Sequence, residues 1–278
     1  MTLTVLHFLL IPALASLVIA GIHAYLGLHV VERGVIFVDL ALAQIAALGA
    51  TVALLVPAFG GDPHGPAVYW MSLGFTFIGA AVFSLVKGQA VRIPQEAIIG
   101  ICYAVASAGV ILAMSQVAGQ SDTLKDMLVG NILSVSWEEV WRMAAMYAAI
   151  GVFHYIYRRR FMTMSMDPKA AAARGWSIRV WDFLFYASFG LVVTRSVAIA
   201  GVLLVFCYLI VPSVAALRYG ERVGVRLAIG WVMGVVVSML GMYFSVEFDL
   251  PTGATIVCTF GLVLILMALA RPLIVRRA

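Results

Sequence analysis

Charged residues are scarce in this sequence. Lysine, arginine, aspartate and glutamate make up 11% of its 278 residues, whereas a soluble domain has about a quarter. Hydrophobic residues make up 64%. The longest polar connection, 158–180, is far shorter than a domain. These values exclude a soluble protein, and they leave no room for a soluble domain between the hydrophobic segments.

Two kinds of chemical motif are also missing. The three cysteines have no CxxC spacing and no nearby histidine pattern, and all lie inside apolar runs: Cys102, Cys207 and Cys258. We interpret them as small packing residues. The sequence has no GxxxxGK[ST] phosphate loop, so we expect no ATPase activity from the chain itself.

Apolar segments long enough to cross a bilayer account for most of the chain. A transmembrane helix needs about 20 mainly apolar residues, and the gaps between charges leave nine such segments: 5–29, 35–57, 67–86, 97–117, 139–157, 182–197, 199–217, 224–245 and 252–270. The sixth is short, so an arrangement with eight spans remains open. The sequence predicts an all-α polytopic membrane protein, with residues 1–278 in one transmembrane domain.

Basic residues mark one side of the membrane. They cluster in every second connection, at Arg33, 87–92, 158–179, 218–226 and 271–277. Connections rich in lysine and arginine stay in the cytoplasm, so this pattern places the N-terminus outside and the C-terminus in the cytoplasm. It also explains the net charge of +5 without a nucleic-acid partner.

Two polar residues, Asp39 and Gln44, lie inside the second apolar segment. An ionisable group at that depth is costly and by default marks a transport path or a buried partner. Asp39 shares a helix face with a stripe of small residues, Ala43, Ala46 and Ala50. Because such stripes let membrane helices pack closely, we expect Asp39 to face protein or a cavity and not lipid.

The roles of Asp39 and Gln44 remain open at this point. In a functional interpretation, either residue contacts a cation that passes through the membrane. In a structural interpretation, Asp39 pairs with Arg33 or with a backbone donor, and Gln44 forms a hydrogen bond between helices. A stand-alone secondary carrier would use Asp39 for a proton cycle.

The histidines give a third possibility, a membrane anchor that binds haem. Such an anchor needs histidines from two facing helices at matched depth, but the five here are isolated: His7, His23, His29, His64 and His154. His23 and His29 are six positions apart and lie on different turns. The sequence therefore gives this alternative little support.

The basic connection at 158–180 contains the pattern of a short helix. Asp167 is a good N-cap and Pro168 suits the first helical position. An alanine-rich run that includes Ala171 and Ala172 follows, and Gly175 is a typical residue just beyond a helix end. We expect one helix near 167–175 that docks on a cytoplasmic partner, the alternative being a helix that lies on lipid headgroups.

Two acids, Glu247 and Asp249, lie in a short turn before the last segment. The positive-inside pattern puts this turn outside. An acidic rim attracts cations, so we expect weak cation contacts there, although a solvated loop would have the same composition.

Several sequence blocks across most of the chain resemble one family, the membrane permeases of bacterial ABC importers for transition metals (zinc, manganese and iron). Their order and spacing agree with that family, and they lie at 27–33 with 38–49, 96–100, 128–135, 201–204 with Pro212, and 249–253.

The resemblance implies a permease subunit in the bacterial inner membrane that works as a homodimer. It would carry a divalent transition-metal ion into the cytoplasm, zinc before manganese or iron, and hold no permanent cofactor. ATP would be hydrolysed on a separate subunit docked at 167–175, through Asp167, Pro168, Ala171, Ala172 and Gly175. An extracytoplasmic metal-binding protein would deliver the ion at Glu247 and Asp249.

The chain departs from the family pattern inside the membrane. The family's first block has an aspartate, a histidine four positions later and a glycine five after that. Counted back from Gly49, the histidine falls on Gln44 and the aspartate on Leu40, one position from Asp39. Asn131 also replaces an acid. Oxygen ligands from Asp39 and Gln44 would form a harder, weaker site than histidine, so we expect transient contacts.

Overall fold

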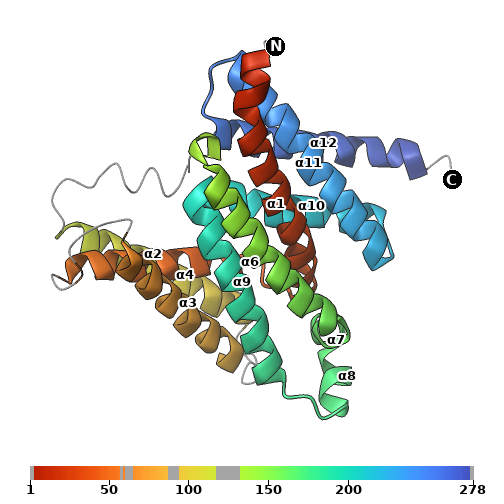
Figure 1. Cartoon of the computed structure of the whole chain (residues 1–278). Coiled ribbons are helices and arrows are strands. Elements are labelled where there is room, and N and C mark those ends of the chain that lie inside the picture. Colours follow the sequence, from red (N-terminus) through yellow and green to blue (C-terminus); the bar gives the residue numbers. More distant parts are fainter. Residues whose placement is uncertain (1–2, 57–58, 60–64, 87–93, 117–131, 276–278) are drawn as a thin grey trace. The chain divides into compact units, whose positions relative to one another are not determined.

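The structure is a computed structural model that describes residues 3–56, 59, 65–86, 94–116 and 132–275 (Figure 1). Side chains are described from residue 9 to residue 270 within these ranges. All the regular elements in this part of the chain are helices. Asn131 and His64 lie outside the described residues.

Long helices occupy the positions of all nine predicted segments. They are α1 (Leu3–Arg33), α2 (Val38–Leu55), α3 (Pro66–Val86), α4 (Gln95–Met114), α6 (Trp137–Ile156), α9 (Ile178–Ala200), α10 (Val202–Tyr219), α11 (Val223–Glu247) and α12 (Thr252–Val275). A 3-10 turn, η2 (Ile132–Ser134), precedes α6. The expectation of an all-α polytopic membrane protein is confirmed.

Eight of these helices in the described ranges are long and apolar enough to cross a membrane, and α6 is the exception. Its first two turns carry Glu138, Glu139 and Arg142, and Arg142 forms an exposed ion pair with Glu138. The ninth span therefore stays a prediction.

The sixth segment is longer than the sequence predicts. The gap between charges suggests 182–197, whereas α9 runs from Ile178 to Ala200 and includes Asp182. That carboxylate is fully buried and paired with Arg33. A charge that is neutralised by a partner does not end an apolar helix. The gap between charged residues therefore underestimates the length of this helix.

The chain forms two compact units. The first comprises Met1–Val31, Asp126–Ala148 and Ile199–Ala278, and the second comprises Glu32–Lys125 and Ala149–Ala198. The single transmembrane domain stays a prediction.

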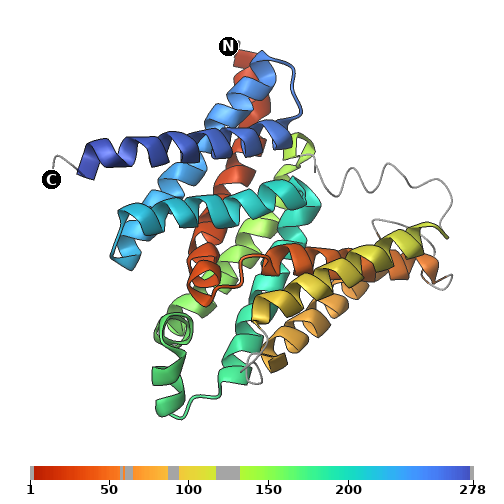
Figure 2. The ribbon, with the colours of Figure 1, turned by 180° about the vertical axis from the view of Figure 1, so that it is seen from behind.

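In the first unit, α10 packs against α11 and α12, which also pack against each other (Figure 2). Small residues allow close approach. A Cβ added at Gly27 of α1 would lie 2.0 Å from the backbone oxygen of Leu209 in α10, and one at Gly241 of α11 would lie 2.7 Å from Ile256 of α12. Contacts of this kind are typical of membrane helices that associate through van der Waals packing.

In the second unit, α2 packs against α3 and α4 (Figures 1 and 2). A Cβ at Gly49 of α2 would lie 2.6 Å from the backbone oxygen of Met71 in α3. A Cβ at Gly109 of α4 would lie 3.0 Å from the side chain of Leu48. These glycines hold α2 between its neighbours and so position the polar residues that it carries.

Two short helices, and not one, connect α6 to α9. They are α7 (Arg158–Met166), which the sequence analysis does not predict, and α8 (Pro168–Ala173). Asp167 separates them with φ −142 and ψ 79, because a residue before proline avoids the helical conformation.

The predicted caps of α8 are confirmed. The Asp167 carboxylate accepts a hydrogen bond of 2.9 Å from the backbone of Ala170. At the other end, Gly175 has φ +71 and its N–H donates to Ala172, while the N–H of Trp176 donates to Ala171. This pair of bonds is a Schellman motif, which satisfies the last carbonyl groups of the helix.

Candidate functional site

Asp39 lies in the first turn of α2, and only 2% of its surface is exposed. Backbone N–H groups of Leu40 and of Asp39 itself contact its carboxylate. The atom Oδ1 is buried and has no hydrogen-bond partner among the described residues. Because a buried, bare carboxylate oxygen is costly, this atom is suited to bind a cation or a proton.

The small-residue stripe that predicts the orientation of Asp39 is also buried, at Ala43, Ala46 and Ala50. The prediction that Asp39 faces protein and not lipid is therefore confirmed. The structural interpretation is right about the backbone donors and wrong about Arg33. The guanidinium of Arg33 pairs with Asp182, its Nη1 lying 2.5 Å from Oδ1.

Glu96 provides a second carboxylate near Asp39. It lies in the first turn of α4, and its Oε1 accepts a hydrogen bond of 3.0 Å from the backbone of Phe37, two residues before Asp39. Its Oε2 is buried without a hydrogen-bond partner in the described part of the chain. The carboxylates of Glu96 and Asp39 are close enough to interact electrostatically.

Carboxylate oxygens without hydrogen-bond partners are suited to a hard divalent cation, since such ions prefer oxygen ligands. The sequence analysis did not consider Glu96 as a candidate. The available signal was its place in the matching block at 96–100, where an acid directly precedes an apolar helix.

Gln44 lies further along α2 and is half-buried. Five positions separate it from Asp39, which is about 140° around an ideal helix, so the two residues do not share a face. Leu48, one turn beyond Gln44, packs against Gly109. The face of α2 that carries Gln44 therefore turns toward α4, the helix that also carries Glu96.

Glu247 and Asp249 belong to the first unit, and both are exposed. Glu247 ends α11, and Asp249 has φ 51. Ser245 fixes the turn: its backbone oxygen accepts a 2.9 Å bond from the Leu250 N–H, and its hydroxyl lies 2.6 Å from that of Thr252. The two acids thus stand on a well-defined turn, and their role in receiving the ion stays a prediction.

The buried histidines are accounted for by local packing. His23 bonds through Nδ1 to the backbone oxygen of Ile19, at 2.8 Å. His154 bonds to Ser188, also at 2.8 Å, and stacks on Phe161 with ring centroids 4.1 Å apart. His29 lies edge-on to a tyrosine ring. Among the described side chains, no group of three or more His, Cys, Asp or Glu could hold a metal ion.

Two neighbouring alanines of α8 differ in exposure. Ala171 is fully buried within the chain, whereas Ala172 is exposed. The chain itself covers the Ala171 side chain, and the expected contact of both alanines with a partner stays a prediction. Ala172 lies on the face that remains open, together with Lys169 and Ala173.

Comparison with known proteins agrees with this architecture. A family model described as "ABC 3 transport family" matches residues 6–271. The chain is 24% identical to a manganese transport system membrane protein, MntC, of Halalkalibacterium halodurans, over 87% of this chain and 80% of that protein. It is 23% identical to a manganese import system permease protein, ScaB, of Streptococcus gordonii, over 96% and 92% of the two chains.

Two solved structures share the fold. PsaBC from Streptococcus pneumoniae in complex with Fab aligns with a TM-score of 0.77 and 22% identity, covering 94% of this chain and 91% of that chain. An inward-facing putative metal-chelate type ABC transporter aligns with a TM-score of 0.69 and 20% identity, over 93% and 85%. The apolar helices and the membrane permeases among its relatives make this a multi-pass protein of the bacterial inner membrane. The match over nearly its whole length shows that the chain belongs to the ABC 3 transport family.

Proposed function

We propose that this chain is the permease subunit of an ATP-driven importer that moves a divalent transition-metal ion into the cytoplasm. The observation that carries the proposal is the buried Asp39 with its bare Oδ1, beside the second bare oxygen of Glu96. A buried ionisable residue in a membrane helix is a functional site by default. Family membership supplies the transport class.

Manganese is the cargo that the site favours. The sequence analysis puts zinc first, but the curated relatives described above are named for manganese. The available donors are carboxylate and carboxamide oxygens from Asp39, Glu96 and Gln44, and such ligands suit manganese better than zinc, which prefers imidazole and thiolate. In this proposal Asp39 and Glu96 hold the ion briefly, and Gln44 is a neutral contact further along α2.

The contact between Arg33 and Ser165 supports the proposed orientation. Its 2.8 Å length puts the end of α1 beside the end of α7, so the α1–α2 turn and the α7–α8 segment lie at the same end of the second unit. The α7–α8 segment carries Arg158, Arg159, Arg160 and Lys169, as cytoplasmic segments do. The exposed face of α8 would then meet the ATP-binding subunit, with Asp167, Pro168 and Gly175 fixing the helix in place.

The remaining partners follow from the same proposal. A second copy of the chain completes the pathway, and an extracytoplasmic metal-binding protein delivers the ion at Glu247 and Asp249. Both acids are exposed, and an acidic surface raises the local concentration of cations.

The test is uptake of radioactive manganese into vesicles that contain this chain, co-expressed and purified with its ATP-binding subunit. The binding protein is added on the outer side. We expect uptake with ATP, and none with a partner subunit whose Walker lysine is replaced. Unlabelled zinc should compete weakly. ATP-driven uptake of zinc without uptake of manganese would overturn the cargo assignment.

The same vesicles test the secondary carrier, which the buried, bare Oδ1 of Asp39 would also suit as a proton site. A secondary carrier would take up manganese without the ATP-binding subunit, driven by an imposed proton gradient. Uptake under those conditions would overturn the ATP-driven proposal.

A further inference from the structure

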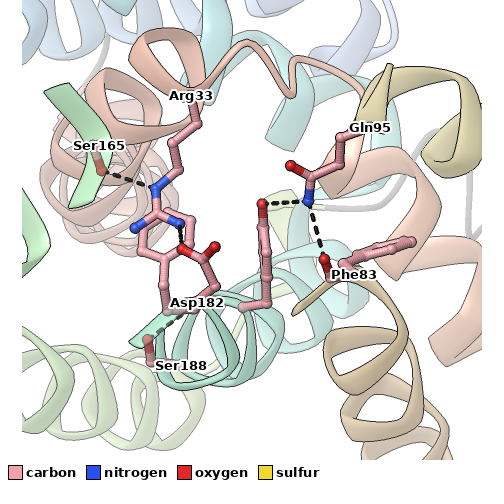
Figure 3. A network of polar contacts seen from close by, with 8 residues as sticks. Arg33, Phe83, Gln95, Ser165, Asp182 and Ser188 are labelled. Carbon is pink, nitrogen blue, oxygen red and sulfur yellow. Dashed lines mark hydrogen bonds and ion pairs between the residues drawn. The ribbon is translucent and has the colours of Figure 1, made fainter. Parts of the chain in front are cut away.

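Arg33, the last residue of α1, belongs to the second unit and is held by two helices of that unit, α7 and α9 (Figure 3). Its Nη1 donates to Oδ1 of Asp182 in α9 at 2.5 Å, and its Nε donates to the hydroxyl of Ser165 in α7 at 2.8 Å. The guanidinium carbon lies 4.0 Å from the centre of the Phe185 ring. We call these four residues, Arg33, Ser165, Asp182 and Phe185, the Arg33 cluster.

The Arg33 cluster fixes geometry more than it adds stability. The side chains of Arg33 and Asp182 are fully buried, and the attraction in such a pair is largely offset by the cost of removing both charges from water. Arginine has a rigid, planar set of donors that can bind two acceptors and stack on a ring together. Lysine cannot reproduce that arrangement, so the cluster specifies how the end of α1 at Arg33 meets α7 and α9.

On one side, the cluster is directly connected to α8. Ser165 is the penultimate residue of α7, and only Met166 separates it from Asp167, the N-cap of α8. Ser165 is buried. Two residues, Met166 and Asp167, therefore connect α8 to the hydroxyl-bearing residue that binds the Arg33 side chain.

On the other side, the cluster is connected to α2. Gly34, with φ +68, turns the chain directly after Arg33. The N–H of Val38 bonds to the oxygen of Val35 at 3.1 Å, and the N–H of Phe37 bonds to Glu96 at 3.0 Å. Asp39 directly follows Val38. The turn is short and has two hydrogen bonds, one of them to Glu96, so it joins Arg33 to the segments that carry Asp39 and Glu96.

The start of α4 is tied to α9 as well. Gln95, next to Glu96, donates to the hydroxyl of Tyr186 at 3.0 Å and to the backbone oxygen of Phe83 at 3.1 Å (Figure 3). Tyr186 is fully buried and adjacent in sequence to Phe185. The helix that carries Asp182 therefore binds Arg33 at one end of the α1–α2 turn and Gln95, the residue before Glu96.

We propose that Arg33 is a positioning residue that transmits movement of α8 to the carboxylates of Asp39 and Glu96. It does not touch the ion. It links the helix that would meet the ATP-binding subunit to the start of α2, so that the state of that subunit sets the separation of the two carboxylates. This inference rests on the proposed function, because it assigns a coupling route to the same transporter.

The test compares metal ions transported per ATP hydrolysed in vesicles that contain the complete complex. Arg33→Lys keeps the positive charge but cannot bind Ser165 and Asp182 together. We expect the variant complex to assemble and to hydrolyse ATP at close to the normal basal rate. Ions per ATP should fall about tenfold, within the usual range of coupling between two sites.

Arg142→Lys is the matched control. Arg142 also forms an ion pair, with Glu138, but both side chains are 70% exposed, so the variant should keep normal coupling. Ser165→Ala is the second test variant. It removes the bond to α7 and leaves the buried ion pair intact, so it should insert normally and still lower the ions transported per ATP.

The outcomes separate this inference from the proposed function. If wild-type complex shows no ATP-driven manganese uptake, the proposed function fails. If wild type transports and Arg33→Lys has a normal ratio of ions to ATP, the coupling role of Arg33 is overturned. If Arg33→Lys does not insert, Ser165→Ala decides, and a normal ratio in that variant overturns the role equally.

Discussion

The two units differ in the kind of polar group that they bury. The buried carboxylates among the described side chains, Asp39 and Asp182, are both in the second unit, as is the buried guanidinium of Arg33. Buried polar side chains of the first unit are hydroxyls and histidines, such as Tyr208, whose hydroxyl lies 2.6 Å from that of Ser238.

That difference separates packing from function. A hydroxyl that bonds to a neighbour or to its own helix is inexpensive to bury, and it serves helix association. A charge inside a membrane protein is expensive and persists where a pathway or a switch needs it. The first unit thus has a neutral interior held by close contacts, and the second has a charged interior that can respond to an ion or to a partner.

The largest expected effect comes from breaking the buried ion pair of the second unit. Asp182→Leu leaves the Arg33 guanidinium buried without its carboxylate, which costs about 3–5 kcal/mol in comparable sites. We expect the free energy of unfolding to fall by about that amount. It is measured on the solubilised protein by titration with a denaturing detergent. Glu138→Leu, which breaks the exposed pair with Arg142, should change it little, and equal losses would contradict the comparison.

The next effect concerns transport. Asp39→Asn keeps the shape of the side chain and removes its charge, so manganese uptake should fall at least ~10-fold, since even residues that only support metal ligands commonly contribute 10–100-fold. Expression and insertion should be unchanged. Tyr208→Phe removes a buried hydroxyl of the first unit and should leave uptake close to normal. Normal uptake by Asp39→Asn would make Asp39 a structural residue.

A smaller effect sharpens the description of the first unit. Gly27→Ala places a methyl group where only 2.0 Å separates it from the Leu209 oxygen, and overpacking of this kind costs about 1–3 kcal/mol. Gly21→Ala, on the same helix with nothing within 4 Å of the added carbon, is the matched control. Equal unfolding free energies for the two variants would show that this close contact does not hold the unit together.

Gln44 should give the smallest change in uptake. Gln44→His puts an imidazole on the face of α2 that turns toward α4, so we expect the purified protein to retain more zinc. Manganese turnover should be severalfold slower, because a site that binds too tightly delays release. Gln44→Ala should be mild. If Gln44 serves helix packing instead, Gln44→Ala will destabilise the protein and Gln44→His will not retain zinc.

Local pattern was sufficient for much of the fold. Long apolar segments predict the positions of all nine long helices, because a helix in lipid satisfies its backbone hydrogen bonds within its own segment. The caps of α8 depend on Asp167 and Gly175 and their nearest neighbours, so they too are visible in the sequence. The protein-facing side of α2 follows from the spacing of Asp39, Ala43 and Ala46.

Contacts between distant segments could not be predicted in this way. Arg33 and Asp182 are 149 positions apart, and the sequence offers Asp39 as a nearer partner for the same arginine. Glu96 joins Asp39 because α2 and α4 pack together, and Ala171 is buried where Ala172 is exposed because of how α8 lies on its own chain. The sequence by itself determined which segments are helices and which residues are costly to bury. The tertiary structure alone decided which charge neutralises which, because that choice depends on the packing of helices far apart in the chain.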